Sequence, residues 1–372
     1  MRNRLPISIA TLLALAACQD PTAAPLAPDA GAPRAARDAA PAPSRTVFMS
    51  GLDAPRGLAF APDGALYVTE SGRTTVTTNC TPLPRGLYCY SGTGAISRKR
   101  RGVQERVVSG LPSYYNANMQ DITGPQHIDF QGAGNAYFTI GWGGPPTGRA
   151  GLGAAGAAFG TLARLHPNGS WSVVADVAAF EQSRNPDGEV FDSNPYGLLA
   201  EGGRQYVTDA GGNSLLEVDN RGAVSLVATF PRVPAPAMFG GSAQAVPTEV
   251  VRGPDGALYV STLTGVPFSQ GAAIIYRVSG GVAQPYATGL KTVTDLAFAP
   301  DGQLYALQYA TGPVFFPTPG ALLRVVPGAG PHLTVAGNLP NATALAIDGD
   351  GAFYVAVNGD RAGVDEVLRI VP

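Results

Sequence analysis

The chain has 372 residues, with 25 Lys and Arg against 27 Asp and Glu, so it lacks the basic surface that binds nucleic acid. Its 48 glycines and 33 prolines, without long amphipathic helical patterns, favour many short strands and turns. These features predict an all-β fold and exclude nucleic acid as a partner.

The first 18 residues have the pattern of a secretory signal peptide. A basic start precedes an apolar run over Ile7–Ala17, which is too short to span a bilayer as a mature helix. The sequence LAAC, which ends at Cys18, resembles a bacterial lipobox and implies that Cys18 is lipidated. We therefore expect an extracytoplasmic lipoprotein of the cell envelope, periplasmic or facing the outer membrane. Ordinary cleavage nearby, giving a soluble secreted protein, is the alternative.

Residues 19–45 are rich in Ala and Pro and contain almost no large apolar side chains. Such a segment cannot bury enough surface to fold, and its prolines keep it extended. We predict a disordered tether here, followed by one folded domain over 46–372.

A Gly-x-x-Tyr motif recurs six times in this domain. A glycine at a tight turn precedes the tyrosine that starts a strand, and the tyrosines are Tyr67, Tyr137, Tyr206, Tyr259, Tyr305 and Tyr354. A second hairpin follows each of the first five motifs, so each unit holds four strands. A period of roughly 50 residues with four strands is typical of a β-propeller blade.

The sixth unit lacks its fourth strand, since EVLRIVP supplies its third strand and the sequence ends there. The missing strand is predicted at the other end of the domain, where Arg45–Leu52 (RTVFMSGL) matches the outer-strand pattern of Glu105–Leu111 (ERVVSGL). We therefore predict a six-bladed β-propeller whose N-terminal strand completes the last blade, and we expect a monomer.

Cys80 and Cys89 lie nine residues apart in one loop. In an oxidising compartment they are expected to form a disulfide. A zinc pair is the alternative, although no companion His or Cys is nearby.

The predicted blades have short turns on one face and long connections on the other. The long connections contain the Cys80–Cys89 loop and residues 141–160, 180–195, 230–246 and 311–320. We call their side the long-loop face. Long loops on a rigid scaffold are where binding sites usually lie, so we expect an unknown small molecule or protein to bind there.

Polar residues are predicted at one mouth of the central channel, where first strands begin and second strands end. They are Glu70, His127, Asp192, Asn194, Asp209, Glu249 and Asp295. The carboxylates would repel one another unless a cation, protonation or hydrogen bonds offset the charge. Oxygen ligands favour calcium, and His127 is a candidate general base. A channel lined by polar groups that hold only water is the alternative.

The stretches GLDAPRGLAFAPDGALYVTE, DSNPYGLLA and VVRGPDGALYVSTLTGVPF resemble the ScyD/ScyE family of exported propellers. That resemblance implies secretion and a six-bladed fold but no established chemistry. The inner hairpins are also similar to NHL repeats and to gluconolactonase-like propellers, which hold calcium with an acid and two polar ligands. Glu70, Asn194 and Asp209 are the nearest counterparts by blade position.

Two functional hypotheses follow from these observations. In the first, the protein is a lipid-anchored binding module that uses its long-loop face. In the second, it is a calcium-dependent hydrolase, similar to a lactonase, that uses the acidic channel mouth. The fold alone cannot choose between them.

Overall fold

The computed structural model describes residues 43–116, 121–359 and 362–372, and the side chains of 362–364 are not described. The chain divides into two units, Met1–Pro41 and Ala42–Pro372, and all described residues belong to the second. The predicted signal peptide, with Cys18, and nearly all of the predicted tether lie outside the described residues. Strand β1 (Ser44–Asp53) begins two residues before the predicted domain boundary.

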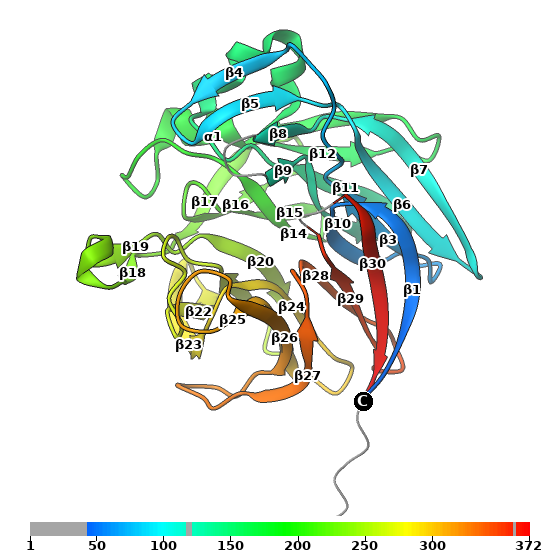
Figure 1. The fold of residues 1–372 in the computed structure, drawn as a ribbon, viewed down its shortest axis with the longest axis vertical. Helices are drawn as coiled ribbons and strands as arrows, with labels where there is room; N and C mark the ends of the chain where they lie inside the picture. Colours follow the sequence, from blue (N-terminus) through cyan, green and yellow to red (C-terminus); the bar gives the residue numbers. More distant parts are fainter. Residues whose placement is uncertain (1–42, 117–120, 360–361) are drawn as a thin grey trace, which may run out of the picture. The chain divides into compact units, whose positions relative to one another are not determined.

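The second unit is almost entirely β-structure, which confirms the predicted fold class. Six four-stranded antiparallel sheets follow the ring in chain order within the described residues, and we call them blades one to six (Figure 1). Blade one contains β2 (Pro55–Phe60), β3 (Leu66–Glu70), β6 (Gly94–Arg100) and β7 (Val103–Leu111). Blade two contains β10 (Pro125–Gln131), β11 (Asn135–Ile140), β12 (Thr161–Leu165) and β13 (Trp171–Asp176). Blade three contains β14 (Pro195–Glu201), β15 (Arg204–Asp209), β16 (Ser214–Val218) and β17 (Val224–Thr229).

The remaining three blades have the same order. Blade four contains β20 (Pro247–Arg252), β21 (Leu258–Thr262), β22 (Ala273–Ser279) and β23 (Val282–Leu290). Blade five contains β24 (Val293–Phe298), β25 (Leu304–Thr311), β26 (Thr318–Arg324) and β27 (Leu333–Leu339). Blade six contains β28 (Ala344–Ile347), β29 (Phe353–Val357), β30 (Ala362–Val371) and β1.

The repeated glycine serves the turn that the sequence predicts. All six motif glycines have a positive φ, from 78° at Gly256 to 119° at Gly134. This left-handed region costs glycine little and other residues much more, so the motif specifies a tight turn between the first two strands of each blade.

Strand β1 pairs with β30 and completes blade six, as predicted. The antiparallel register runs from Ser44 opposite Val371 to Asp53 opposite Ala362, and the two strands lie side by side in Figure 1. The contact between blades six and one is a hydrophobic cluster that includes Met49, Leu52 and Val68. Burial of this surface stabilises the closed arrangement.

A ring of hydroxyl hydrogen bonds links each blade to the next. The Oγ1 atoms of Thr69, Thr139 and Thr208 donate to backbone carbonyls of Gln126, Tyr196 and Thr248, at 2.7, 2.7 and 2.5 Å. The Oγ1 atoms of Thr248, Thr294 and Thr343 then donate to the carbonyls of Val293, Ala342 and Pro55, at 2.7, 3.0 and 2.8 Å. The last bond returns to blade one, so the innermost strands form a closed ring around a channel.

Extra elements cover the long-loop face of blades one and two. Strands β4 (Cys80–Leu83), β5 (Gly86–Tyr90), β8 (Tyr114–Asn116) and β9 (Asp121–Thr123) form a separate sheet, next to the 3-10 helix η1 (Pro146–Ala158) and the helix α1 (Val177–Arg184). The Cys80–Cys89 disulfide joins β4 to β5, as predicted. Buried Trp142 packs against the rings of Tyr88 and Tyr114 beneath this sheet.

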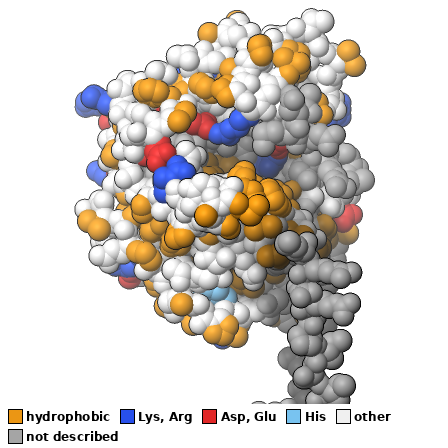
Figure 2. Space-filling model, turned by 60° about the vertical axis from the view of Figure 1, so that its left-hand side comes forward, with side chains coloured by type: hydrophobic (Ala, Val, Ile, Leu, Met, Phe, Trp, Pro, Cys, Tyr) orange, Lys and Arg blue, Asp and Glu red, His pale blue; other side chains and the backbone are white. Residues whose placement is uncertain are grey.

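Hydrophobic side chains also remain exposed, and Figure 2 shows them in patches on one face, with acidic and basic groups between them. Farther along the chain, the long connection between blades three and four forms a small hairpin, made by β18 (Val233–Pro234), η2 (Ala237–Phe239) and β19 (Ser242–Ala243). None of the helices in the described ranges is both long and apolar enough to cross a membrane.

Candidate functional site

The centre of the channel is lined by one equivalent position from each innermost strand. These positions hold Gly57, His127, Gly197, Glu249, Asp295 and Ala344. The small residues let neighbouring strands approach closely, because a Cβ added to Gly57 would lie 2.6 Å from the Cα of His127. A Cβ added to Gly197 would lie 2.8 Å from the Cα of Glu249. Three polar side chains therefore share the centre of a narrow ring.

His127, Glu249 and Asp295 come together at this level. One ligand atom from each lies within 4.8 Å of the others, and the Nε2 of His127 is 3.1 Å from the Oε2 of Glu249. The residues are 7%, 2% and 2% exposed. We call these three residues the channel cluster. They come from blades two, four and five, and the sequence alignment of the repeats had placed all three at this position.

A cavity of about 300 Å³ extends from the channel cluster. Its lining includes Arg252 and Phe298, which end β20 and β24 at the short turns. The cavity therefore extends toward the short turns and away from the long-loop face. This differs from the prediction, which placed these residues at the mouth on the side of the long loops.

Arg56 and Tyr196 lie one residue nearer to the long loops than the ring position of their strands. The Nη2 of Arg56 donates to the Oδ1 of Asp121 at 2.9 Å. Burial raises the pKa of Tyr196 to about 12, with contributions from the charges of Asp295 and Glu249, while Arg56 acts in the opposite direction. Tyr196 thus lies close to both Arg56 and the acidic residues of the channel cluster.

The electrostatics of the channel cluster are unbalanced. Burial lowers the pKa of His127 to about 4, so the imidazole is neutral at neutral pH. Burial, together with the neighbouring charge of Asp295, raises the pKa of Glu249 well above its usual range, and burial does the same to Asp295. Within the described residues, no Lys or Arg forms an ion pair with either carboxylate.

Backbone donors satisfy only part of these two acids. Asp295 accepts hydrogen bonds from the N–H groups of Leu296 and Leu345, at 2.6 and 2.7 Å. The Oε1 of Glu249 accepts from the N–H of Val250 at 2.9 Å, but its Oε2 has no hydrogen-bond partner among the described residues. The Nδ1 of His127 also lacks one there.

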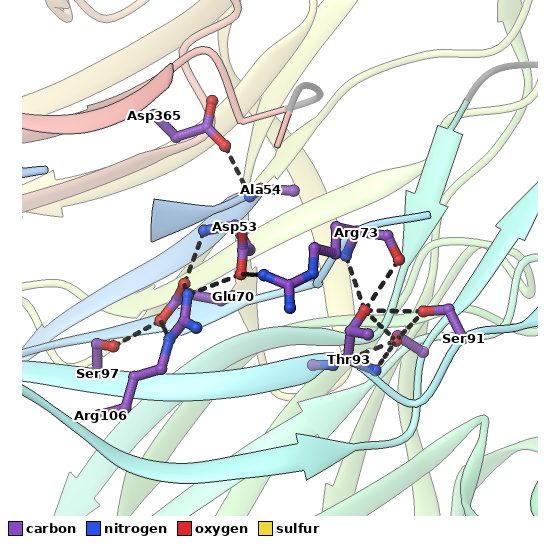
Figure 3. A network of polar contacts seen from close by, with 11 residues as sticks. Asp53, Ala54, Glu70, Arg73, Ser91, Thr93, Ser97, Arg106 and Asp365 are labelled. Atoms are coloured by element: carbon purple, nitrogen blue, oxygen red, sulfur yellow. Dashed lines mark hydrogen bonds and ion pairs between the residues drawn. The ribbon is translucent and has the colours of Figure 1, made fainter. Parts of the chain in front are cut away.

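Glu70 has a different environment, although the sequence grouped it with the channel residues. Its Oε1 accepts from the Oγ of Ser97 at 2.5 Å, and its Oε2 accepts from Arg106 at 2.6 Å and from the N–H of Asp53 at 2.7 Å (Figure 3). The reason is strand alternation, because Glu70 shares its side of β3 with Val68, which packs against blade six. Glu70 is therefore turned away from the channel.

Asn194 and Asp209 do lie together, but they organise loops. The Oδ1 of Asp209 accepts from the backbone N–H of Asn194 at 2.6 Å and from those of Gly211 and Gly212 at 3.1 Å each. The Oδ1 of Asn194 accepts from the N–H of Trp142 at 3.0 Å. Glu70 is already paired with Arg106 and is turned away from the channel, so Glu70, Asn194 and Asp209 do not form the calcium site that the family resemblance implies.

Asp192 lies on the long-loop face and forms an ion pair with Arg85 of the β4–β5 hairpin. The pair lines a cavity of about 160 Å³ together with Phe191 and Val190. The structure therefore separates Asp192 from the channel cluster and places it at a surface recess.

Two acids with raised pKa values were missed by the sequence reasoning. Asp129 lies in the channel cavity two residues after His127, and burial raises its pKa to about 6. The period of two along a strand was an available signal for it. Glu181 lies in α1, where burial and the charges of Asp209 and Asp187 raise its pKa to about 8. Nothing in the local sequence pattern distinguishes Glu181 from a surface residue of a loop.

Comparison with known proteins supports the fold alone. No known protein family matches the chain, and no curated protein matches it. Virginiamycin B lyase from Staphylococcus aureus is a similar solved structure, with 14% identity and a TM-score of 0.50 over 89% of this chain and 99% of that one. The soluble aldose sugar dehydrogenase from Escherichia coli is similar to the same degree, with 14% identity, a TM-score of 0.50 and the same two coverages.

Proposed function

We propose that this protein is an exported, lipid-anchored β-propeller that binds a small molecule or a protein partner through its long-loop face. Lipidation of Cys18, the tether and membership of the ScyD/ScyE family are parts of this proposal. The Cys80–Cys89 disulfide supports an extracytoplasmic location, because disulfides persist in oxidising compartments.

The distribution of exposed hydrophobic side chains carries the proposal. Among the described residues, the exposed Phe and Met side chains all belong to the long loops, and they are Phe191, Met238, Phe315 and Phe316. By contrast, each outermost strand has a single exposed aliphatic residue, and these are Val47, Val103, Val173, Leu226, Val282 and Leu333. Aromatic and Met side chains are enriched at binding surfaces, whereas scattered single Val and Leu residues are ordinary.

The exposed rings of the long loops have a defined arrangement. Phe239 lies 6.0 Å from Phe315, and Phe268 lies 4.6 Å from Phe316, measured between ring centroids. Met238 is 84% exposed beside them in the chain. On blades one to three, the recess lined by Arg85, Asp192 and Phe191 adds charged groups to the same face.

Site-specific photo-crosslinking tests this proposal. A benzophenone amino acid placed at Phe316 of the full chain, expressed and exported in cells, is expected to give a covalent adduct of defined mass. The same probe at Val282, which is exposed on an outermost strand, is the matched control and should give none. Equal adducts at both positions, or no adduct at Phe316, would contradict binding through the long-loop face.

A second candidate function is supported by the channel cluster. A neutral imidazole beside two carboxylates, in a cavity of about 300 Å³, has the groups needed for metal-dependent hydrolysis of a lactone or ester. In that case the metal ligands are not Glu70, Asn194 and Asp209, and His127 is a ligand of the ion and not the general base that the sequence suggested. This candidate requires the channel cluster to hold a metal ion.

A further inference from the structure

Two members of the channel cluster have the spacing of ligands bound to a single ion. The Nε2 of His127 and the Oε2 of Glu249 are 3.1 Å apart, and two ligands bound to the same ion at about 2.1 Å are separated by roughly 3 Å. No hydrogen bond joins them, because the Oε2 of Glu249 has no hydrogen-bond partner among the described residues. A buried carboxylate oxygen of Glu249 therefore lies close to an imidazole nitrogen of His127, and no hydrogen bond of good geometry connects the two atoms.

The remaining coordination partner comes from Asp295, whose carboxylate has an oxygen within 4.8 Å of the other two ligand atoms. Both acids are 2% exposed, and no Lys or Arg of the described chain neutralises them. Two buried carboxylates without a counterion are costly to ionise, so a divalent cation would balance their charge when both are deprotonated.

The chemistry of the donors selects the class of ion. One imidazole and two carboxylates suit a divalent first-row transition ion such as zinc or manganese. Calcium prefers six to eight oxygen ligands and rarely accepts an imidazole, so it suits this site less well.

We propose that His127, Glu249 and Asp295 form a divalent transition-metal site at the centre of the propeller channel. The cavity toward the short turns supplies an entry path and space for water or another exogenous ligand on the open side of the ion. This site lies away from the long-loop face, so it does not depend on the function proposed for that face.

Metal binding to the full chain tests the proposal directly. Protein treated with a chelator and then dialysed is titrated with Zn²⁺ or Mn²⁺ alone, and bound metal is measured by calorimetry and elemental analysis. We expect one equivalent to bind and the melting temperature to rise, since an ion that binds only the folded state stabilises it. Calcium at the same concentration should give a much smaller shift.

Variants locate the site. Glu249→Gln, Asp295→Asn and His127→Gln should each weaken binding by about tenfold or more, since the loss of supporting contacts alone often costs this much. His166→Gln, in the turn after β12, and Asp129→Asn, whose oxygens accept from the N–H groups of Phe130 and Ala200, should keep the single equivalent. With Co²⁺ as a spectroscopic probe, the visible absorption bands of the wild-type protein should change in His127→Gln.

Two results would overturn the proposal. The first is that the wild-type protein binds neither Zn²⁺ nor Mn²⁺, which decides against the site without any variant. The second is an equivalent of metal that persists in all three ligand variants, because the ion would then lie elsewhere. If one variant does not fold, as judged by near-ultraviolet circular dichroism, the other two still decide the outcome.

Discussion

The buried carboxylates of this protein fall into two groups with opposite surroundings. Glu70 and Asp209, at the ends of β3 and β15, receive hydrogen bonds on both oxygens, and Glu70 is paired with Arg106. Glu249 and Asp295, inside the channel, have fewer donors: Asp295 accepts one backbone hydrogen bond on each oxygen, Glu249 accepts on one oxygen alone, and neither has a cation within the described residues. Burial is similar in both groups, so burial does not tell whether a carboxylate stabilises the fold. The hydrogen-bond and ion-pair partners of the carboxylate decide whether it stabilises the fold. Substitutions in the two groups should therefore change the unfolding free energy in opposite directions.

The largest effect is expected at the first group. Arg106→Ala leaves the fully buried Glu70 without its counterion, and because the Arg106 side chain is 39% exposed, we expect a loss of roughly 2–3 kcal/mol of unfolding free energy. Urea denaturation measures this loss. The matched control is Arg204→Ala, because the Arg204–Glu217 pair lies at the surface, where solvent screens the interaction, and should contribute little to stability. Equal losses in both variants would show that Glu70 does not need Arg106.

The second group should respond in the other direction. With a chelator present at pH 8, Glu249→Gln should raise the unfolding free energy, because it removes a carboxylate that is costly to bury without a cation. Glu70→Gln under the same conditions should lower the unfolding free energy, since it weakens the pairing with Arg106. If Glu249→Gln is also less stable than the wild type in chelator, the two groups are not as different as the structure indicates.

A smaller effect on the unfolding free energy is expected at Glu181, whose surroundings are intermediate between those of the two groups. Its pKa is raised from 4.5 to about 8, so the folded state keeps a proton that the unfolded state has lost. The unfolding free energy should therefore fall as the pH rises from about 4.5 to about 8 and then level off. Glu181→Gln should make the unfolding free energy less dependent on pH in denaturation measured across this range.

The control for this pH dependence is Glu105→Gln, because Glu105 is exposed on β7. It should leave the slope unchanged. A slope that is the same in the wild type and in Glu181→Gln would assign the pH dependence to other groups.

Much of the fold could be predicted because its signals are local. The turn glycine before Tyr67 and its five counterparts need only a positive φ, and the matching outer-strand patterns were enough to pair β1 with β30. The position on each innermost strand that lines the centre of the channel was also predictable. Equal spacing from the turn aligned His127, Glu249 and Asp295 across three blades. These features depend on residues within one repeat.

The partners of the other acids depend on contacts that spacing does not specify. Glu70 and Thr69 are neighbours at the end of β3, yet Thr69 bonds to blade two while Glu70 faces Arg106, on the outermost strand of its own blade. Adjacent residues of a strand point to opposite faces of the sheet. A prediction that selects Glu70 in place of Thr69 therefore assigns the side chain to the wrong face. Asp209 was placed correctly near Asn194, but its backbone donors depend on the conformation of the Gly211–Gly212 turn.

The pairing of β1 with β30 has a consequence for the order of folding. Strand β1 emerges early in synthesis, but its partner is complete only when the chain has reached Val371. Until then, β1 and β29 both present unpaired backbone edges, which invite association with other chains. A polypeptide interrupted before Ala362 would retain five whole blades and still present unpaired edges prone to aggregation, so the last ten-residue strand decides whether the nascent chain closes into a ring.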